Sequence, residues 1–400
     1  MEVLTYATMP LPPGCIAAAS LVNYAAMTRR PGDGGAPATE ATRKLLAQLD
    51  KIRGQLDTVD SEILGLLHRR IELVRSVGKI KEGLATRSWA PAREKSILER
   101  LVHENRGRFP EHGLRQIFRE IFSISREQER PIHVGYLGLP GSLTHAAAVE
   151  QFGSATRYQP GDSIEQVFDR VASGDLDYGF VPVEVSCEGI VSSSLEVFLR
   201  SDLRICAESF YSLELCLAAS ARRKIRRVFM QPQVYGLVRE WIGLEMPQGI
   251  EVSLVAESRE AAAACKATPG SACITQAFTA RHFELKVLRE RIPYGPARKL
   301  RFLTAGTEVP RATSSDKTTI AFSLTDRVGV LEMALKPFRR HRINLTFLES
   351  YPQSKASPTV TFFADILGHF ERPAIAEAVE ELRRNCAFVR VLGSYPVFRS

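Results

Sequence analysis

The sequence lacks the features of membrane-spanning, fibrous and wholly disordered chains. No stretch of its 400 residues approaches the roughly 18 uninterrupted apolar residues that a membrane helix needs. Hydrophobic residues make up 44% and charged residues 24%, which are ordinary values for a globular protein. At about 150 residues per domain, this length predicts two or three folded domains.

Cysteine pairing motifs and long basic runs are also missing. The seven cysteines include no CxxC motif, so we expect neither a disulfide framework nor a zinc site, and a reducing, cytoplasmic location fits best. Lysine and arginine total 53 against 45 acidic residues, a net charge of +8. No basic run is long enough to indicate nucleic-acid binding, and excess arginine also serves pockets for small carboxylates.

Residues 1–40 show no helical or strand period, and prolines and glycines interrupt them. We expect a disordered extension, or a start codon placed too early with Met27 as the alternative start. A targeting segment is the other interpretation, although the basic residues that should precede its apolar core are missing.

Residues 41–130 have the pattern of an all-helical unit. From Leu45 to Ile80, apolar residues recur at alternating spacings of three and four, which predicts a long helix with a coiled-coil-like seam. Two shorter helices are expected near residues 93–105 and 114–129. Arg70 lies on the seam, where an unpaired charge would be costly, so it is either salt-bridged at the surface or part of an anion pocket.

The rest of the chain predicts two further domains. Strands and helices alternate over residues 131–308, which favours an α/β domain with mainly parallel sheets. After a linker, residues 317–400 have the strand and helix order βαββαβ, which is ferredoxin-like. The predicted fold class is therefore multidomain, with an all-α bundle, an α/β domain and an α+β domain.

The helical unit resembles the all-helical chorismate mutases. The resemblance rests on charges at set spacings, from Arg53 through the segments 66–70, 77–81 and 91–94 to 121–125. It implies that Arg53, from the partner subunit, and Arg70 hold the two carboxylates of chorismate. Lys81 would donate to the ether oxygen of the breaking bond.

The same resemblance implies further roles in that pocket. Glu94 would accept from the substrate hydroxyl, Arg93 would lie nearby and Ser125 would line the carboxylate side. Many members have glutamine where Glu129 stands, as a second donor to the ether oxygen. A carboxylate cannot donate but a carboxylic acid can, so we predict mutase activity that falls as pH rises.

Residues 131–306 resemble the prephenate dehydratases, which have two α/β lobes with the substrate in the cleft between them. The resemblance rests on the glycine-rich turn 135–145, the segment 177–184, Met230–Gln233 and Arg301-Phe302. The residues that it implies for catalysis or substrate binding are Ser142, Thr144, Glu184, Ser186, Cys187, Arg301 and Phe302.

The reactive positions depart from that family. Leu300 stands where the family has the threonine that helps the ring hydroxyl depart, and leucine cannot donate a proton. Three interpretations follow: non-aromatising decarboxylation, which we favour slightly; dehydration helped by Thr144 or Ser186; and an inactive regulatory lobe. An amino analogue of prephenate is an alternative substrate.

The C-terminal domain resembles the amino-acid-binding ACT domain. The segments Asp326–Leu331 and Glu349–Pro352 carry the resemblance, and the implied effector-binding residues are Gly329, Leu331, Glu349 and Ser350. The family usually has arginine where Tyr351 stands. Either the effector differs from phenylalanine, or the domain is a dimerisation module without a ligand.

The order of the three domains resembles that of the bifunctional chorismate mutase–prephenate dehydratases. This implies chorismate and prephenate as substrates, a homodimer that exchanges its long helix, and no metal or organic cofactor. The rival hypothesis is a sensor that binds a shikimate-pathway metabolite without turning it over.

Overall fold

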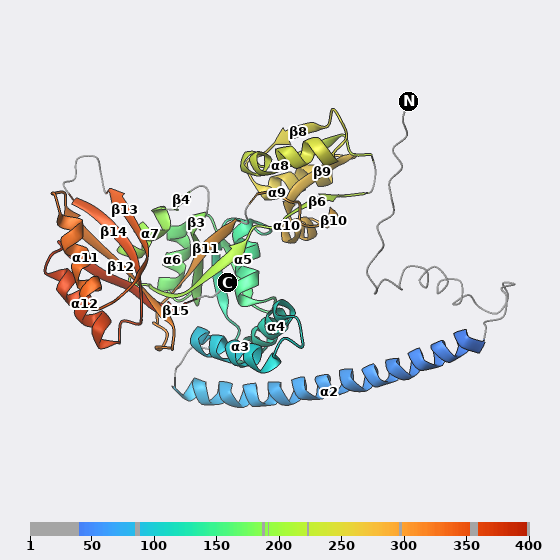
Figure 1. Cartoon of the computed structure of the whole chain (residues 1–400), viewed down its shortest axis with the longest axis horizontal. Coiled ribbons are helices and arrows are strands. Elements are labelled where there is room, and N and C mark those ends of the chain that lie inside the picture. Colours follow the sequence, from blue (N-terminus) through green and yellow to red (C-terminus); the bar gives the residue numbers. More distant parts are fainter. Residues whose placement is uncertain are drawn as a thin grey trace, which may run out of the picture. The chain divides into compact units, whose positions relative to one another are not determined.

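The computed structural model describes residues 40–84, 89–185, 189–190, 192–221, 224–295, 298–352 and 359–397 (Figure 1). The predictions for residues 1–39, Ser186 and Cys187 lie outside the described residues. No described helix is both long enough and apolar enough to span a membrane.

Helix α2 (Glu40–Leu84) is 45 residues long, as the seam predicts. Its apolar side chains are exposed in the single chain, including Leu45 and Leu66, which each have 65% of their surface accessible. Among the described residues, the part of α2 up to Arg70 forms one unit, and the residues from Ile71 on form a second unit. An apolar seam of this kind is typical of helices that pack against a partner helix.

Helices α3 (Pro91–Asn105) and α4 (Glu111–Glu129) begin two and three residues earlier than the pattern predicts. Pro91 suits the first turn of α3, where no backbone donor is needed. Ser123 of α4 links the helical region to the next domain, because its Oγ accepts a hydrogen bond from the backbone N–H of Ala155 at 3.0 Å. A β-carbon at Gly153 would collide with Ser123, so glycine permits this packing.

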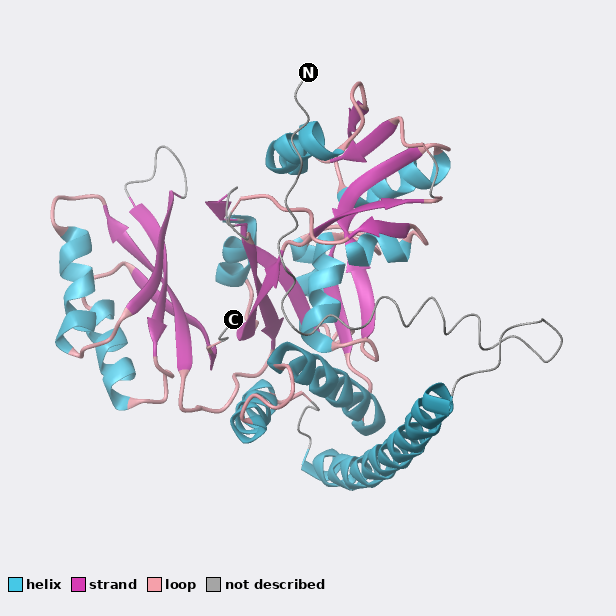
Figure 2. Cartoon of the chain, turned by 45° about the vertical axis from the view of Figure 1, so that its right-hand side comes forward, coloured by secondary structure: helices cyan, strands magenta, loops and turns pink. Residues whose placement is uncertain are grey.

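The first α/β lobe contains a six-stranded mixed sheet (Figure 2). Its strand order is β2-β1-β3-β11-β5, with β4 beside β3. The elements of this lobe are β1 (His133–Leu137), α5 (Leu143–Phe152), β2 (Arg157–Gly161), α6 (Ile164–Ala172), β3 (Tyr178–Val185), β4 (Gly189–Ile190), α7 (Ser192–Arg200), β5 (Arg204–Ser212) and β11 (Lys299–Gly306). Strands β1, β2 and β3 are parallel, but β11 is antiparallel to both β3 and β5.

The second lobe is inserted between β5 and β11 and has a five-stranded sheet of order β10-β6-β9-β7-β8. Its elements are β6 (Leu215–Ala219), β7 (Arg227–Met230), α8 (Pro232–Glu245), β8 (Glu251–Leu254), α9 (Ser258–Ala267), β9 (Ser271–Gln276), α10 (Ala277–His282) and β10 (Lys286–Arg289). Both sheets are therefore mixed, which corrects the expectation of mainly parallel sheets. The correction arises because β11 and β6 each join their sheet antiparallel to a neighbour.

The third sheet is four-stranded and antiparallel, with the order β13-β14-β12-β15. Its elements follow the predicted order: β12 (Asp316–Thr325), α11 (Val330–Arg340), β13 (Leu345–Pro352), β14 (Thr359–Leu367), α12 (Pro373–Arg383) and β15 (Phe388–Pro396). Helices α11 and α12 lie side by side on one face of this sheet (Figure 1). Strand β15 packs against β5 of the first sheet, and a β-carbon at Gly393 would collide with the backbone of Ile205.

Candidate functional sites

The last turns of α2 and the end of α4 bring Lys81 and Glu129 into contact. Lys81 Nζ lies 2.6 Å from Glu129 Oε1, and the side chains are 27% and 11% exposed. Gly78 permits this approach, because a β-carbon there would lie 3.2 Å from Glu129 Cγ. Two residues that the sequence predicts around one reacting oxygen are thus direct neighbours.

Glu94 and Ser125 have partners within the chain. Arg126, which the sequence analysis missed, forms an ion pair with Glu94 and donates to the carbonyl of Phe152. Ser125 Oγ donates to the Ile121 carbonyl one turn earlier. Arg126 is buried and lies four residues after Phe122, so a charge on the apolar stripe of α4 was the signal that could have revealed it.

The remaining predicted mutase residues are seen on their own helices. Arg53 is exposed and lies 3.5 Å from Asp50, and Arg70 is partly buried within α2. Arg93 is exposed near the start of α3. Their roles toward substrate remain predictions.

The glycine-rich turn before α5 joins the two lobes. Ser142 caps α5 by accepting from the His145 backbone N–H, and Gly141 has a φ of +85°, which favours glycine. Thr279 of α10 donates to the Gly141 carbonyl at 2.8 Å. Ser142 and Thr144 are both partly buried at this junction.

His145 is the centre of an aromatic cluster at that turn. It stacks on Tyr136 with ring centroids 4.7 Å apart and packs edge-on against Phe278. Its Nδ1 accepts from the Gly141 N–H at 3.1 Å, which places the proton of the neutral ring on Nε2. Burial, together with nearby His282, lowers the pKa of His145 to about 4. A histidine that ends a glycine-rich turn was the available signal, but two of its neighbours, Phe278 and His282, come from the other lobe.

Strands β3 and β11 place the other predicted dehydratase residues. Glu184 lies in β3, where its Cα is paired in register with that of Arg301. Phe302 stacks on Phe180 at 4.9 Å in the core, with 1% of its surface exposed. Leu300 is also buried in that core. Phe302 therefore offers no surface to a substrate here, and we assign it to packing in place of substrate binding.

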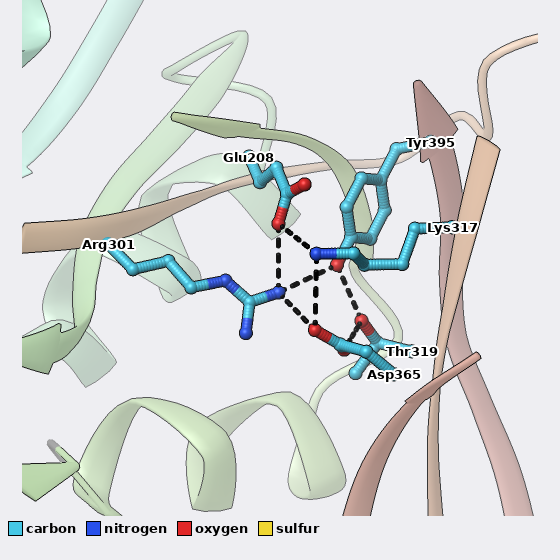
Figure 3. Close-up of polar contacts among 6 residues, drawn as sticks. All are labelled: Glu208, Arg301, Lys317, Thr319, Asp365 and Tyr395. Carbon is cyan, nitrogen blue, oxygen red and sulfur yellow. Dashed lines mark hydrogen bonds and ion pairs between the residues drawn. The ribbon is translucent and has the colours of Figure 1, made fainter. Parts of the chain in front are cut away.

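Arg301 belongs to a buried ionic cluster between the first and third sheets (Figure 3). Its Nη2 lies 3.0 Å from Glu208 Oε2 and 2.5 Å from Asp365 Oδ2, and it also donates to the Tyr395 hydroxyl at 3.1 Å. Lys317 adds a second cation, with Nζ 2.8 Å from the same Glu208 oxygen. These carboxylates neutralise the charge of Arg301 within the chain, so this conformation does not present it to a substrate carboxylate.

The predicted effector residues lie on two elements of the C-terminal domain, helix α11 and strand β13. Gly329 precedes α11 with a φ of +81°, and Leu331 lies in the first turn of that helix. Glu349 and Ser350 lie on β13, at an edge of the sheet. No group of His, Cys, Asp and Glu among the described residues is arranged to hold a metal ion.

Two family profiles match the chain. The profile for chorismate mutase type II matches residues 52–130, and the profile for prephenate dehydratase matches residues 134–309. A bifunctional chorismate mutase/prephenate dehydratase of Aquifex aeolicus (strain VF5) is 35% identical over 359 residues, covering 88% of this chain and 98% of that protein. A protein of the same description from Pseudomonas aeruginosa is 33% identical over 357 residues, covering 87% and 98%.

The chain belongs to the bifunctional chorismate mutase/prephenate dehydratases. It is thus an isomerase fused to a lyase, as the sequence predicts. A prephenate dehydratase from Arthrobacter aurescens, solved in complex with L-Phe, is 26% identical with a TM-score of 0.60, covering 67% of this chain and 93% of that one. In this bifunctional chain, the third sheet lies beyond both segments that the family profiles match.

Proposed function

We propose that this chain rearranges chorismate to prephenate and then converts prephenate to phenylpyruvate by loss of CO₂ and water. Membership of the bifunctional family is the observation that carries the proposal. The sequence alone favoured decarboxylation with the ring hydroxyl retained. The comparisons give that preference no support, because the relatives are described as dehydratases.

The mutase step needs positioning and charge stabilisation. The rearrangement is pericyclic, so it requires no nucleophile or base, and cationic donors aimed at the ether oxygen lower the barrier. Lys81 is such a donor, and its 2.6 Å contact holds it beside Glu129. We propose that Arg70 and the partner's Arg53 bind the substrate carboxylates, with Arg93, Glu94 and Ser125 around them.

The dehydration step needs a proton donor for the departing hydroxyl. The electrons of the breaking carbon–carboxylate bond enter the ring, and hydroxide leaves as water once it is protonated. Leu300 is buried in the core and has no proton to give. Thr144, in the first turn of α5 at the junction of the lobes, is the hydroxyl that we propose for this role, with Glu184, Ser186 and Cys187 around the substrate.

We propose further that residues 317–400 form an ACT domain that binds an amino acid through Gly329, Leu331, Glu349 and Ser350. The βαββαβ order and the L-Phe bound to the Arthrobacter protein support this assignment. Calorimetric titration of the full chain with L-Phe tests it. Saturable binding that weakens in Glu349→Ala supports the assignment, and no heat of binding would leave a domain without this effector.

Product analysis tests the catalytic proposal. Purified chain incubated with chorismate is expected to form phenylpyruvate, identified by its ultraviolet absorbance and its mass. A product lighter than prephenate by CO₂ alone would replace dehydration with decarboxylation. Prephenate that accumulates unchanged would indicate a mutase with an inactive second domain. Chorismate that stays unchanged would favour the rival hypothesis of a sensor that binds a metabolite without turning it over.

A further inference from the structure

A cavity of about 530 Å³ lies where the helical region, the first lobe and the ends of the third sheet meet. Helices α3 and α4 form one wall, and Ala207 and Glu208 of β5 form another. Ser315 and Pro396 contribute the third wall from the two ends of the C-terminal domain. This volume lies within the range of small-molecule sites, about 300–1,000 Å³.

Apolar side chains cover much of the helical wall. They include Trp89, Leu98, Val102 and Phe122. Trp89 and Phe122 are themselves buried, and Trp89 is fixed by Phe152 with ring centroids 4.8 Å apart. This wall is preformed and suits an apolar or aromatic group.

Most charged groups of the lining are already paired. Lys95 donates to the Ser315 carbonyl at 3.0 Å, and Arg115 lies 2.7 Å from Glu111. Glu94 is paired with Arg126. Of the residues predicted for the mutase site, Glu94 also lines this cavity, but the buried Arg126 balances its charge.

Arg119 is the exception. Within the part of the chain that the structure describes, no hydrogen bond and no ion pair within 4 Å is formed by its guanidinium, although it lines the cavity. Burial lowers its pKa, only partly opposed by the more distant Glu150 and Glu120. A partly buried guanidinium that lines a cavity without a bonded anion is suited to receive one from solution.

We propose that this cavity binds a small amphipathic monoanion, an aromatic carboxylate whose carboxylate pairs with Arg119 and whose ring lies against Trp89 and Phe122. One unmatched cation calls for one negative charge. Occupancy also places the ligand beside Glu208, the carboxylate shared by Arg301 and Lys317. The site is thereby continuous with the ionic cluster that joins the first and third sheets.

Tryptophan fluorescence provides a direct test. The chain has two tryptophans, so Trp241→Phe leaves Trp89 as the only reporter. We expect 3-phenylpropanoate to change Trp89 emission saturably in the full-length protein. Arg119→Gln in that background should weaken binding at least tenfold, as removal of a charged partner does. The uncharged analogue 3-phenylpropanamide should bind to the protein that retains Arg119 as weakly as 3-phenylpropanoate binds to Arg119→Gln.

Two further variants complete the design. Arg108→Gln removes an equal charge from an exposed position after α3 and should leave the affinity unchanged. Val102→Phe should fill the cavity and abolish binding while circular dichroism stays unchanged. No saturable response, or equal affinity in Arg119→Gln, would overturn the proposal. The fluorescence measurement needs no catalytic turnover, so a failure of the proposed reactions would not affect this test of the cavity.

Discussion

Arg301 and Asp365 meet across the boundary between two domains, with Nη2 2.5 Å from Oδ2. The side chains are 5% and 1% exposed, so water does not weaken the pair. Breaking a buried pair from one side leaves an uncompensated charge and costs about 3–5 kcal/mol. The contact therefore contributes to holding β11 of the first lobe against β14.

Asp365→Asn is the direct test of that contact. We expect its free energy of unfolding to fall by about 3 kcal/mol, because Arg301 and Lys317 lose a shared carboxylate. Differential scanning fluorimetry should show the first thermal transition lowered by roughly 5–10 °C. Asp202→Asn, at a fully exposed carboxylate paired with Arg390, is the matched control and should change little. Equal midpoints for both variants would contradict the assigned role.

Stability should depend on pH through His145. Its pKa is about 4 in the folded chain against an ordinary value of 6.5, so the unfolded chain binds more protons between these values. Stability from this residue is complete above about pH 6.5 and is lost as the pH falls toward 4, with about 2 kcal/mol lost between pH 7 and pH 5. Melting midpoints at pH 7 and pH 5 measure the loss, and His145→Gln should reduce the difference. An unreduced difference in that variant would assign the loss to other groups.

Glu129→Gln should raise mutase activity. An amide adds a donor beside the ether oxygen, and it releases Lys81 from the ion pair seen here. We expect kcat/KM with chorismate to rise about tenfold at pH 8, the equivalent of one hydrogen bond, and the fall with rising pH to disappear. Glu127→Gln, on the same turn of α4, is the control. A flat pH profile in the original chain, unchanged by the substitution, would exclude this role.

The seam of α2 should hold two chains together. Leu56 and Ile63 are exposed by 57% and 50% in the single chain, and an apolar surface of this kind favours association. Leu56→Lys combined with Ile63→Lys should convert a dimer to a monomer in light scattering. Mutase activity should fall at least a hundredfold, since Arg53 would no longer reach a partner's pocket, while the second reaction continues. Asp57→Lys with Ser61→Lys, at exposed positions of α2 away from the seam, should remain dimeric.

Local periodicity predicted most elements, because each depends on neighbours in the chain. The seam of α2 and the βαββαβ order both follow from repeats of two to four residues. Strand direction did not, since β11 reaches its place between β3 and β5 only after the whole second lobe. The sequence of such a strand contains no local signal that tells whether it will pair parallel or antiparallel to its neighbours.

The candidate sites show the same difference between local features, which the sequence predicted, and long-range contacts, which it did not. Lys81 and Glu129 were predicted through a resemblance, and they lie in contact. The partners of Arg301 were missed because they lie 64 to 94 positions away and come from other strands. Phe302 was misassigned because a motif shows adjacency along the chain, while the strand places neighbouring side chains on opposite faces.

The ionic cluster also limits how this architecture can be rearranged. Glu208 and Arg301 belong to the first sheet, while Lys317, Thr319, Asp365 and Tyr395 belong to the third (Figure 3). A chimera that received its last 85 residues, 316–400, from a relative would leave Arg301 and Glu208 buried without their ionic partners, unless the relative had matching residues at the positions of Lys317 and Asp365. The C-terminal domain therefore cannot be exchanged alone between relatives, because the residues of the ionic cluster on both sheets must match.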